Sequence, residues 1–250
     1  MKMQTLKTIL VLAILIIAAA IAIAEPYGPD GITKGPSERR TSFGGDPTAV
    51  NAQAGNITQL LINTSVITKR WQGYYGNITG TITLDDANGH TMYDWSANDF
   101  SVAGKVFAAN NTVSNWTAVR CVNLTGNGTI GPTGVQPGVN STILENTFGI
   151  ARTDADGFDE TFATTNDITV GTNTLANCPS THLYIANASQ TTKFNETILT
   201  LYNESLIIFA AQLEPSITGF DNRTWDFEMI VANNGDSGIL TPYQFYVELT

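Results

Sequence analysis

Positively charged side chains are scarce in this sequence. The 250 residues include 12 lysines and arginines against 22 aspartates and glutamates, which gives a net charge of −10 at pH 7. Proteins that bind nucleic acid present a basic stripe to the phosphates. Without such a stripe, nucleic acid is not an expected partner. Hydrophobic residues make up 42% of the chain, so a folded core is expected.

Histidine and the common catalytic motifs are also nearly absent. The chain has two histidines, His90 and His182, and contains no Gly-x-Ser-x-Gly, no His-Glu-x-x-His and no glycine-rich phosphate-binding loop. A carboxylate pair such as Asp94 and Asp99 could cleave a glycosidic bond, but any acidic β protein offers such pairs. We therefore expect a protein that is not an enzyme and has no catalytic residues.

Cysteine is limited to Cys121 and Cys178. In an oxidising compartment, an isolated pair most simply forms one disulfide. This bond would close a loop of about 58 residues and stabilise the fold by roughly 4 kcal/mol in the chain-entropy description. The alternative is a metal or catalytic site. It has little support, because Cys121 has no histidine or second cysteine nearby and His182 alone completes no ligand set beside Cys178.

A single long apolar run lies near the start of the sequence. Lys2 and Lys7 precede apolar residues 9–24, which end in Ala-Ile-Ala. The pattern predicts a signal peptide over residues 1–24 that is cleaved at its C-terminal end. An uncleaved N-terminal anchor is the alternative, and it would be the only membrane contact. Both interpretations place the rest of the chain outside the cell, secreted or at the cell surface.

N-glycosylation sequons are unusually frequent. They occur at 12 of the 22 asparagines, about threefold more often than the serine and threonine content predicts by chance. Part of the excess follows from the frequency of asparagine and threonine in turns and strands. For an exported chain we expect many of these sites to carry N-linked glycans. The sites are Asn56, Asn63, Asn77, Asn110, Asn115, Asn123, Asn127, Asn140, Asn187, Asn195, Asn203 and Asn222.

Residues 25–54 are rich in proline and glycine and have almost no apolar periodicity. This composition predicts an extended, flexible arm ahead of one folded domain over residues 55–250. The arm carries Lys34, Arg39 and Arg40, whereas the domain is acidic, so it could lie on a neighbouring subunit. Residues 33–54 are then the candidate for a donated strand. A solvated spacer is the alternative.

The domain itself has the pattern of an all-β protein. Short runs of β-branched and aromatic residues alternate with Gly, Asn and Asp clusters, which predicts an antiparallel β-sandwich, Ig-like or jelly-roll-like. Alternation predicts that Ile82 and Leu84 pack on the core. The consecutive apolar residues 206–211 indicate a strand buried on both faces or at an interface. The expected strands are residues 58–69, 78–84, 92–96, 102–108, 116–124, 141–148, 181–186, 194–202, 205–214, 224–232 and 242–249.

An acidic stretch around Gly157 is a candidate calcium site. Asp154, Asp156, Asp159 and Glu160 lie within seven residues. Ca²⁺ takes six to eight oxygen ligands and accepts backbone carbonyls among them. The match to a helix-loop-helix calcium loop is partial, since the glycine comes two positions early and the distant glutamate is missing. A solvated acidic turn is the alternative.

Three aromatic residues, Trp71, Tyr74 and Tyr75, lie within five positions at a glycine-containing corner. Exposed aromatic rings can stack on sugars, whereas buried ones anchor a sandwich core. Spacing does not distinguish these roles. We expect core packing for the cluster, with Tyr74 or Tyr75 the best candidates to contact a glycan.

The segments WQGYYGNITGTITLDDANGHTMYDW, RCVNLTGN, IARTDADGFDETF, GFDNRTWDFEMIV and TPYQFYVELT resemble a family of archaeal exported surface glycoproteins without an assigned function. The resemblance covers most of residues 56–250 and implies location and class alone. A eukaryotic secreted glycoprotein is the alternative, although so few cysteines make it less favoured.

These features together predict an exported, N-glycosylated, non-catalytic structural protein of the cell surface. It would be an envelope component or a subunit of an extracellular filament or pilus, and its partners would be further copies of itself or other envelope proteins. The alternative is a carbohydrate-binding or cell-surface-binding module, an adhesin, with a glycan as ligand. Ca²⁺ is the one candidate metal.

Overall fold

The computed structural model describes residues 25–40, 49–63, 65, 67–96, 104–124, 129–131, 134–136, 140–189, 192–201, 206–235 and 240–249. The expected signal peptide, the sequons at Asn127 and Asn203, and Asp99 lie outside these residues. Within the described part of the chain, no helix is both long and apolar enough to cross a membrane.

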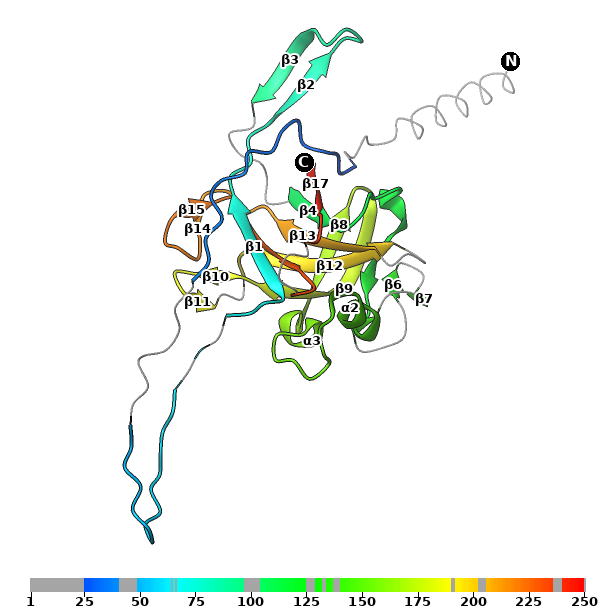
Figure 1. The fold of residues 1–250 in the computed structure, drawn as a ribbon. Coiled ribbons are helices and arrows are strands. Elements are labelled where there is room, and N and C mark those ends of the chain that lie inside the picture. The colour runs from blue at the N-terminus through cyan, green and yellow to red at the C-terminus, as the bar shows by residue number, and fades with distance from the viewer. Residues whose placement is uncertain are drawn as a thin grey trace, which may run out of the picture.

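A nine-stranded antiparallel sheet forms the centre of the described structure (Figure 1). Strand β12 (Asn195–Leu201) lies in the middle and pairs with β13 (Ile207–Gln212) along one edge. Along its other edge it pairs with β5 (Val119–Val122) through residues 199–201 and with β9 (Asn173–His182) through residues 195–197. The strand order is β17 (Gln244–Glu248), β4 (Lys105–Ala109), β13 (Ile207–Gln212), β12 (Asn195–Leu201), β5 (Val119–Val122), β6 (Thr129–Gly131) and β7 (Gly134–Gln136), with β9 (Asn173–His182) beside β12 and β8 (Thr164–Val170) beside β9.

Both faces of this sheet are buried. Phe209 of β13 lies in one hydrophobic cluster and its neighbour Ile208 lies in the other, and neither is accessible to solvent. The first face is covered by β16 (Phe227–Ala232), α2 (Ser141–Phe148) and α3 (Phe158–Thr161). The second is covered by the β8–β9 hairpin and by Trp116. The expectation of a strand buried on both faces at residues 206–211 is confirmed.

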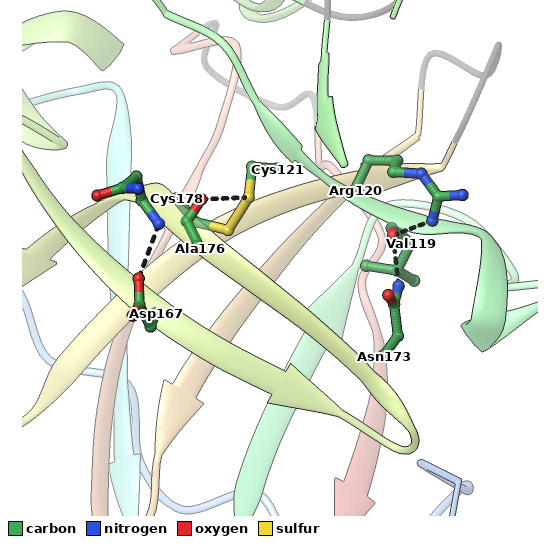
Figure 2. Close-up of a disulfide and its surroundings, with 8 residues drawn as sticks. Val119, Arg120, Cys121, Asp167, Asn173, Ala176 and Cys178 are labelled. Atoms are coloured by element: carbon green, nitrogen blue, oxygen red, sulfur yellow. Dashed lines mark hydrogen bonds between the residues drawn. A yellow bond between two sulfur atoms is a disulfide. The ribbon is translucent and has the colours of Figure 1, made fainter. Parts of the chain in front are cut away.

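The predicted disulfide is present. It joins Cys121 of β5 to Cys178 of β9, with the two Cα atoms 5.0 Å apart and both side chains fully buried (Figure 2). The same pair of segments is joined by a hydrogen bond, since the Asn173 amide donates to the Val119 carbonyl at 2.8 Å. The disulfide therefore fastens the β8–β9 hairpin to the second face of the sheet.

The remaining described elements are short. β16 pairs with β1 (Trp71–Gly76) to form a second layer above the first face of the sheet. A separate hairpin extends from the body (Figure 1) and consists of β2 (Thr81–Asp85) and β3 (Thr91–Ser96). The others are β10 (Tyr184–Ile185) with β11 (Ala188–Ser189), β14 (Ile217–Thr218) with β15 (Thr224–Trp225), and the single-turn helix η1 (Trp116–Ala118). The fold is thus all-β, antiparallel and sandwich-like, as expected.

One expected strand, residues 141–148, is the helix α2. The Asn140 side chain accepts a hydrogen bond from the Ile143 backbone N–H at 3.0 Å, and Gly149 ends the helix with a left-handed φ of 63°. These are standard helix caps. Leu144 and Phe148, four residues apart, bury the same side of the helix in the first cluster. The capping residues, rather than the β-branched content, decide the local structure.

The expected strand at residues 58–69 is also absent. Its described residues lie in an extended segment without strand pairing, which reaches away from the body (Figure 1). Leu60, Leu61 and Ile62 are 54%, 90% and 82% exposed. The β-like composition of this segment has no neighbouring strand in the described chain to pair with.

Candidate functional site

The β2–β3 hairpin carries an apolar face that the rest of the described chain leaves open. Ile82 pairs with Trp95, and Leu84 pairs with Tyr93. Side chains alternate across a strand, so these four share one face. They are between 46% and 59% exposed, and the Tyr93 and Trp95 rings contact each other at 5.0 Å between centroids.

The hairpin turn is well hydrogen-bonded. The Asp86 carboxylate accepts from the backbone N–H groups of Asn88 and His90 at 2.8 and 2.9 Å, and the His90 ring contacts it at 2.8 Å. These hydrogen bonds, the one from the His90 side chain first, lower the pKa of Asp86. Gly89 has a φ of 81°, which a glycine adopts without strain. Local hydrogen bonds and the glycine conformation therefore define the turn between β2 and β3.

This arrangement corrects the prediction for Ile82 and Leu84. Alternation was expected to place them on the core, but they are 46% and 50% exposed. Ile78, just before β2, does pack against the first cluster. The chain leaves the core between these positions, and an isolated two-stranded hairpin buries little of its own apolar surface.

The aromatic corner is divided between core and surface. The Trp71 ring lies 5.1 Å from that of Phe158, and Tyr74 lies 5.3 Å from Phe245, so both belong to the core. Tyr75 is 44% exposed, in accord with the expectation that one of the two tyrosines faces solvent.

Tyr75 belongs to an exposed aromatic cluster. Its ring contacts Phe220 at 5.0 Å and Trp225 at 4.9 Å. The Arg223 guanidinium lies over the Trp225 ring at 5.0 Å, and Asp221 accepts hydrogen bonds from both Arg223 and the indole of Trp225. A group of aromatic faces with a fixed charged pair is the kind of surface on which sugars stack.

The four acidic residues proposed to bind calcium do not all face one point. The Asp156 carboxylate accepts a hydrogen bond from the Thr68 hydroxyl, and Asp154 accepts from the Ala151 N–H at 3.0 Å. Asp159 pairs with Arg152 at 3.0 Å. In the described residues, no three Asp, Glu, His or Cys side chains stand together in an arrangement ready to hold a metal.

A fifth carboxylate, Glu145 of α2, lies beside this loop and was missed in the sequence analysis. Its side chain is 2% exposed, and neither of its oxygens accepts a hydrogen bond from the described residues. The Arg152 guanidinium lies 3.9 Å away. Burial, with the nearby charge of Asp159 as the next cause, raises the pKa of Glu145. Only the helical conformation of residues 141–148 brings it here.

Most of the described sequon asparagines are accessible. Asn56, Asn63, Asn77, Asn115, Asn187 and Asn222 are exposed, whereas Asn110, Asn123, Asn140 and Asn195 are half-buried. The Asn115 Oδ1 atom accepts from the Thr117 N–H and hydroxyl at 2.9 and 2.7 Å. A glycan is attached through Nδ2, so this hydrogen bonding is compatible with glycosylation.

The start of the predicted arm contacts the outer edge of the sheet. Tyr27 and Val247 of β17 exchange two backbone hydrogen bonds, of 3.1 and 2.8 Å. Residues 28–40 continue without strand pairing and are mostly exposed. The edge of β17 is therefore engaged at one residue pair in the described structure.

A small cavity of about 210 Å³ is lined by residues that include Lys105, Asp167, Thr197 and Gln212. Small-molecule sites are commonly about 300–1,000 Å³ and mostly apolar. This cavity is smaller than such sites.

Comparisons with protein-family models, curated proteins and solved structures find no match to this chain. The candidate sites therefore depend on the geometry of this chain alone. Three of them have defined residues: the apolar face of the β2–β3 hairpin, the Tyr75 aromatic cluster, and the acidic loop beside Glu145.

Proposed function

We propose that this chain is an exported, N-glycosylated structural protein of the cell surface that assembles with further copies of itself. The assembly would be an extracellular filament or part of the envelope. No catalytic role is included in the proposal.

The observation that carries the proposal is the apolar face of the β2–β3 hairpin. A fully buried aromatic side chain removes about 150–250 Å² from water, so the half-exposed Tyr93 and Trp95 together present on the order of 200 Å². Projecting apolar surface of this kind marks an interaction site on soluble proteins. Ile82 and Leu84 enlarge the same face.

A second copy of the chain is the occupant that the chemistry favours. The exposed arm carries the positive charges of Lys34 and Arg39, whereas the domain is strongly negative. Complementary charges guide association, so the arm of one copy would be attracted to the domain of another. The chain also exposes a second apolar segment at residues 60–62. Arm residues 33–40 and 49–54 form no strand ladder in the described structure. They are therefore available to add to the β17 edge of a neighbouring copy.

Glycans fit this role. The exposed sequon asparagines would carry bulky, hydrophilic groups over much of the surface. Such a coat keeps an exterior protein soluble and restricts association to the surfaces that it leaves open. The hairpin strands β2 and β3 contain no sequon asparagine, which leaves their apolar face free for a protein partner.

Site-specific photo-crosslinking tests the proposed contact. Tyr93 is replaced by a photoreactive benzophenone amino acid in the full, glycosylated chain, and crosslinked peptides are identified by mass spectrometry. The expected result is a crosslink to a peptide from a second copy. Thr83, on the opposite face of the hairpin, serves as the matched control position. Equal crosslinking from both positions, or none from Tyr93 at high concentration, would count against the contact.

A second candidate function is carbohydrate binding, favoured by the Tyr75, Phe220 and Trp225 cluster. Here the chain would act as an adhesin that stacks its aromatic rings on a glycan. Trp225→Ala should then abolish binding on a glycan array, whereas Trp95→Ala should not. An array on which the wild-type chain binds no sugar would remove this candidate.

A further inference from the structure

A buried carboxylate that accepts no hydrogen bond from the described residues lies at the base of the acidic loop. Glu145 is 2% exposed at its side chain, and both Oε atoms lack a hydrogen-bond donor among the described residues. Asp159 Oδ1 is also buried without a partner. Burying ionised oxygens in this state is costly, so such groups bind a proton or a cation.

Several oxygens converge around Gly157. A methyl group placed on its Cα would come within 2.5 Å of Glu160 Oε2, 3.2 Å of the Asp154 carbonyl oxygen and 3.6 Å of Glu145 Oε1. The three oxygens come from α2, the loop that follows it and α3, and the lack of a side chain at position 157 leaves open the space that borders all three.

The charge around this point is not balanced. Arg152 pairs with Asp159 at 3.0 Å and lies 3.9 Å from Glu145, and within the described residues the carboxylates of Glu145, Asp154, Asp159 and Glu160 make no other ion pair. Burial is the largest cause that raises the pKa of Glu145. The negative charges of Asp159, Glu160 and Asp154 raise this pKa further, whereas the positive charge of Arg152 lowers it. A divalent cation would neutralise this excess.

We propose that this cluster is a calcium site centred on Glu145. Glu145, Glu160 and the Asp154 carbonyl are the protein ligands, and water would complete the coordination shell. Ca²⁺ accepts backbone carbonyls and water beside carboxylates, so fewer than three inward-facing acidic side chains suffice. Such a site would bind weakly, with a Kd of about 10⁻⁴–10⁻³ M, as extracellular modules do.

This ligand set differs from the one that the sequence indicates. Asp156 is excluded, because its carboxylate accepts a hydrogen bond from Thr68. Glu145 is included although it lies nine positions before Asp154. A comparison of the variants Glu145→Gln and Asp156→Asn therefore distinguishes a structured site from a general attraction of Ca²⁺ to acidic residues. Each substitution removes one charge.

The test measures binding and stability on the full, glycosylated chain at neutral pH. Thermal unfolding is followed in chelator, in Ca²⁺ and in Mg²⁺. Tb³⁺ luminescence excited through tryptophan reports binding directly, because the Trp71 indole donates a hydrogen bond to the Asp156 carbonyl at 2.7 Å. At a Ca²⁺ concentration ten times Kd, the unfolding equilibrium constant should fall about tenfold.

The expected pattern across variants is specific. Glu145→Gln should lose the Ca²⁺ response and the Tb³⁺ signal, and in chelator it should be at least as stable as wild type, since an unpaired buried charge is gone. Asp156→Asn should keep both responses. The proposal is overturned if wild type does not respond to millimolar Ca²⁺, if Glu145→Gln responds normally, or if Asp156→Asn loses the response. If low pH stabilises the protein in chelator and Ca²⁺ has no effect, the cluster binds protons rather than Ca²⁺, and the proposal is overturned.

Discussion

Trp95→Ala should weaken self-association without destabilising the domain. Trp95 is 51% exposed on a hairpin that lies outside the two hydrophobic clusters. If assembly buries the exposed half of this ring, about 100 Å² leaves water. At about 25 cal/mol per Å², this burial contributes roughly 2.5 kcal/mol for each contact, which corresponds to about a 70-fold change in Kd.

The effect on folding should be much smaller. Trp95 faces Ile82 across the hairpin, and one such cross-strand pair is worth about 0.2–1 kcal/mol. The midpoint of cooperative unfolding should therefore stay within a few degrees of wild type. Sedimentation velocity over a concentration series measures association, and circular dichroism measures unfolding.

Thr83→Ala is the matched control for this prediction. Thr83 lies between Ile82 and Leu84 in β2, is exposed, and pairs with Asp94 in the regular part of the hairpin, so strand alternation places it on the opposite face from Trp95. It should leave association unchanged. The reasoning is refuted if Trp95→Ala associates as wild type does, or if Thr83→Ala weakens association to the same extent.

Three further predictions concern the folded domain. Replacing Cys121 and Cys178 together by alanine should lower the free energy of unfolding by roughly 4 kcal/mol, as measured by urea denaturation under oxidising conditions, because the disulfide no longer restricts the unfolded chain; a loss below about 1 kcal/mol would contradict this. Asn140→Ala in unglycosylated protein should cost about 1 kcal/mol and Asn140→Asp much less, because Asn140 caps α2; equal losses would argue against the cap. Glu196 is fully buried, which raises its pKa well above the usual value although the Ile230 N–H donates to it. At pH values above the normal glutamate pKa, the folded state therefore binds more protons than the unfolded state. The free energy of unfolding accordingly falls as pH rises through neutral, by at most about 1.4 kcal/mol per pH unit for this group. Glu196→Gln should flatten that fall in urea titrations between pH 5 and pH 8, and an unchanged slope would refute the assignment.

The sequence predicts the parts of the fold that depend on local pattern. The consecutive apolar residues 206–211 indicated a strand buried on both faces or at an interface, and β13 is buried on both faces. The isolated cysteine pair implied a disulfide, which the structure contains. Both inferences follow from composition and local chemistry, so neither requires knowledge of the tertiary structure.

The candidate sites depend on tertiary placement, and sequence patterns do not contain it. Glu145 reaches the acidic loop because residues 141–148 form a helix, whereas their β-branched residues favoured a strand. Ile82 and Leu84 alternate as core residues do, yet the hairpin lies away from the core. For the hairpin, the apolar pattern was recognised, but the described chain leaves this face exposed.

The mass of the protein in solution tests the central claim most directly. Full-length chain secreted by a closely related glycosylating host would be measured by light scattering, and the same sample would be imaged by electron microscopy. Our account predicts regular assemblies whose mass grows with concentration and which Trp95→Ala disrupts. A monomer that persists at every concentration, with its glycans in place, would contradict it.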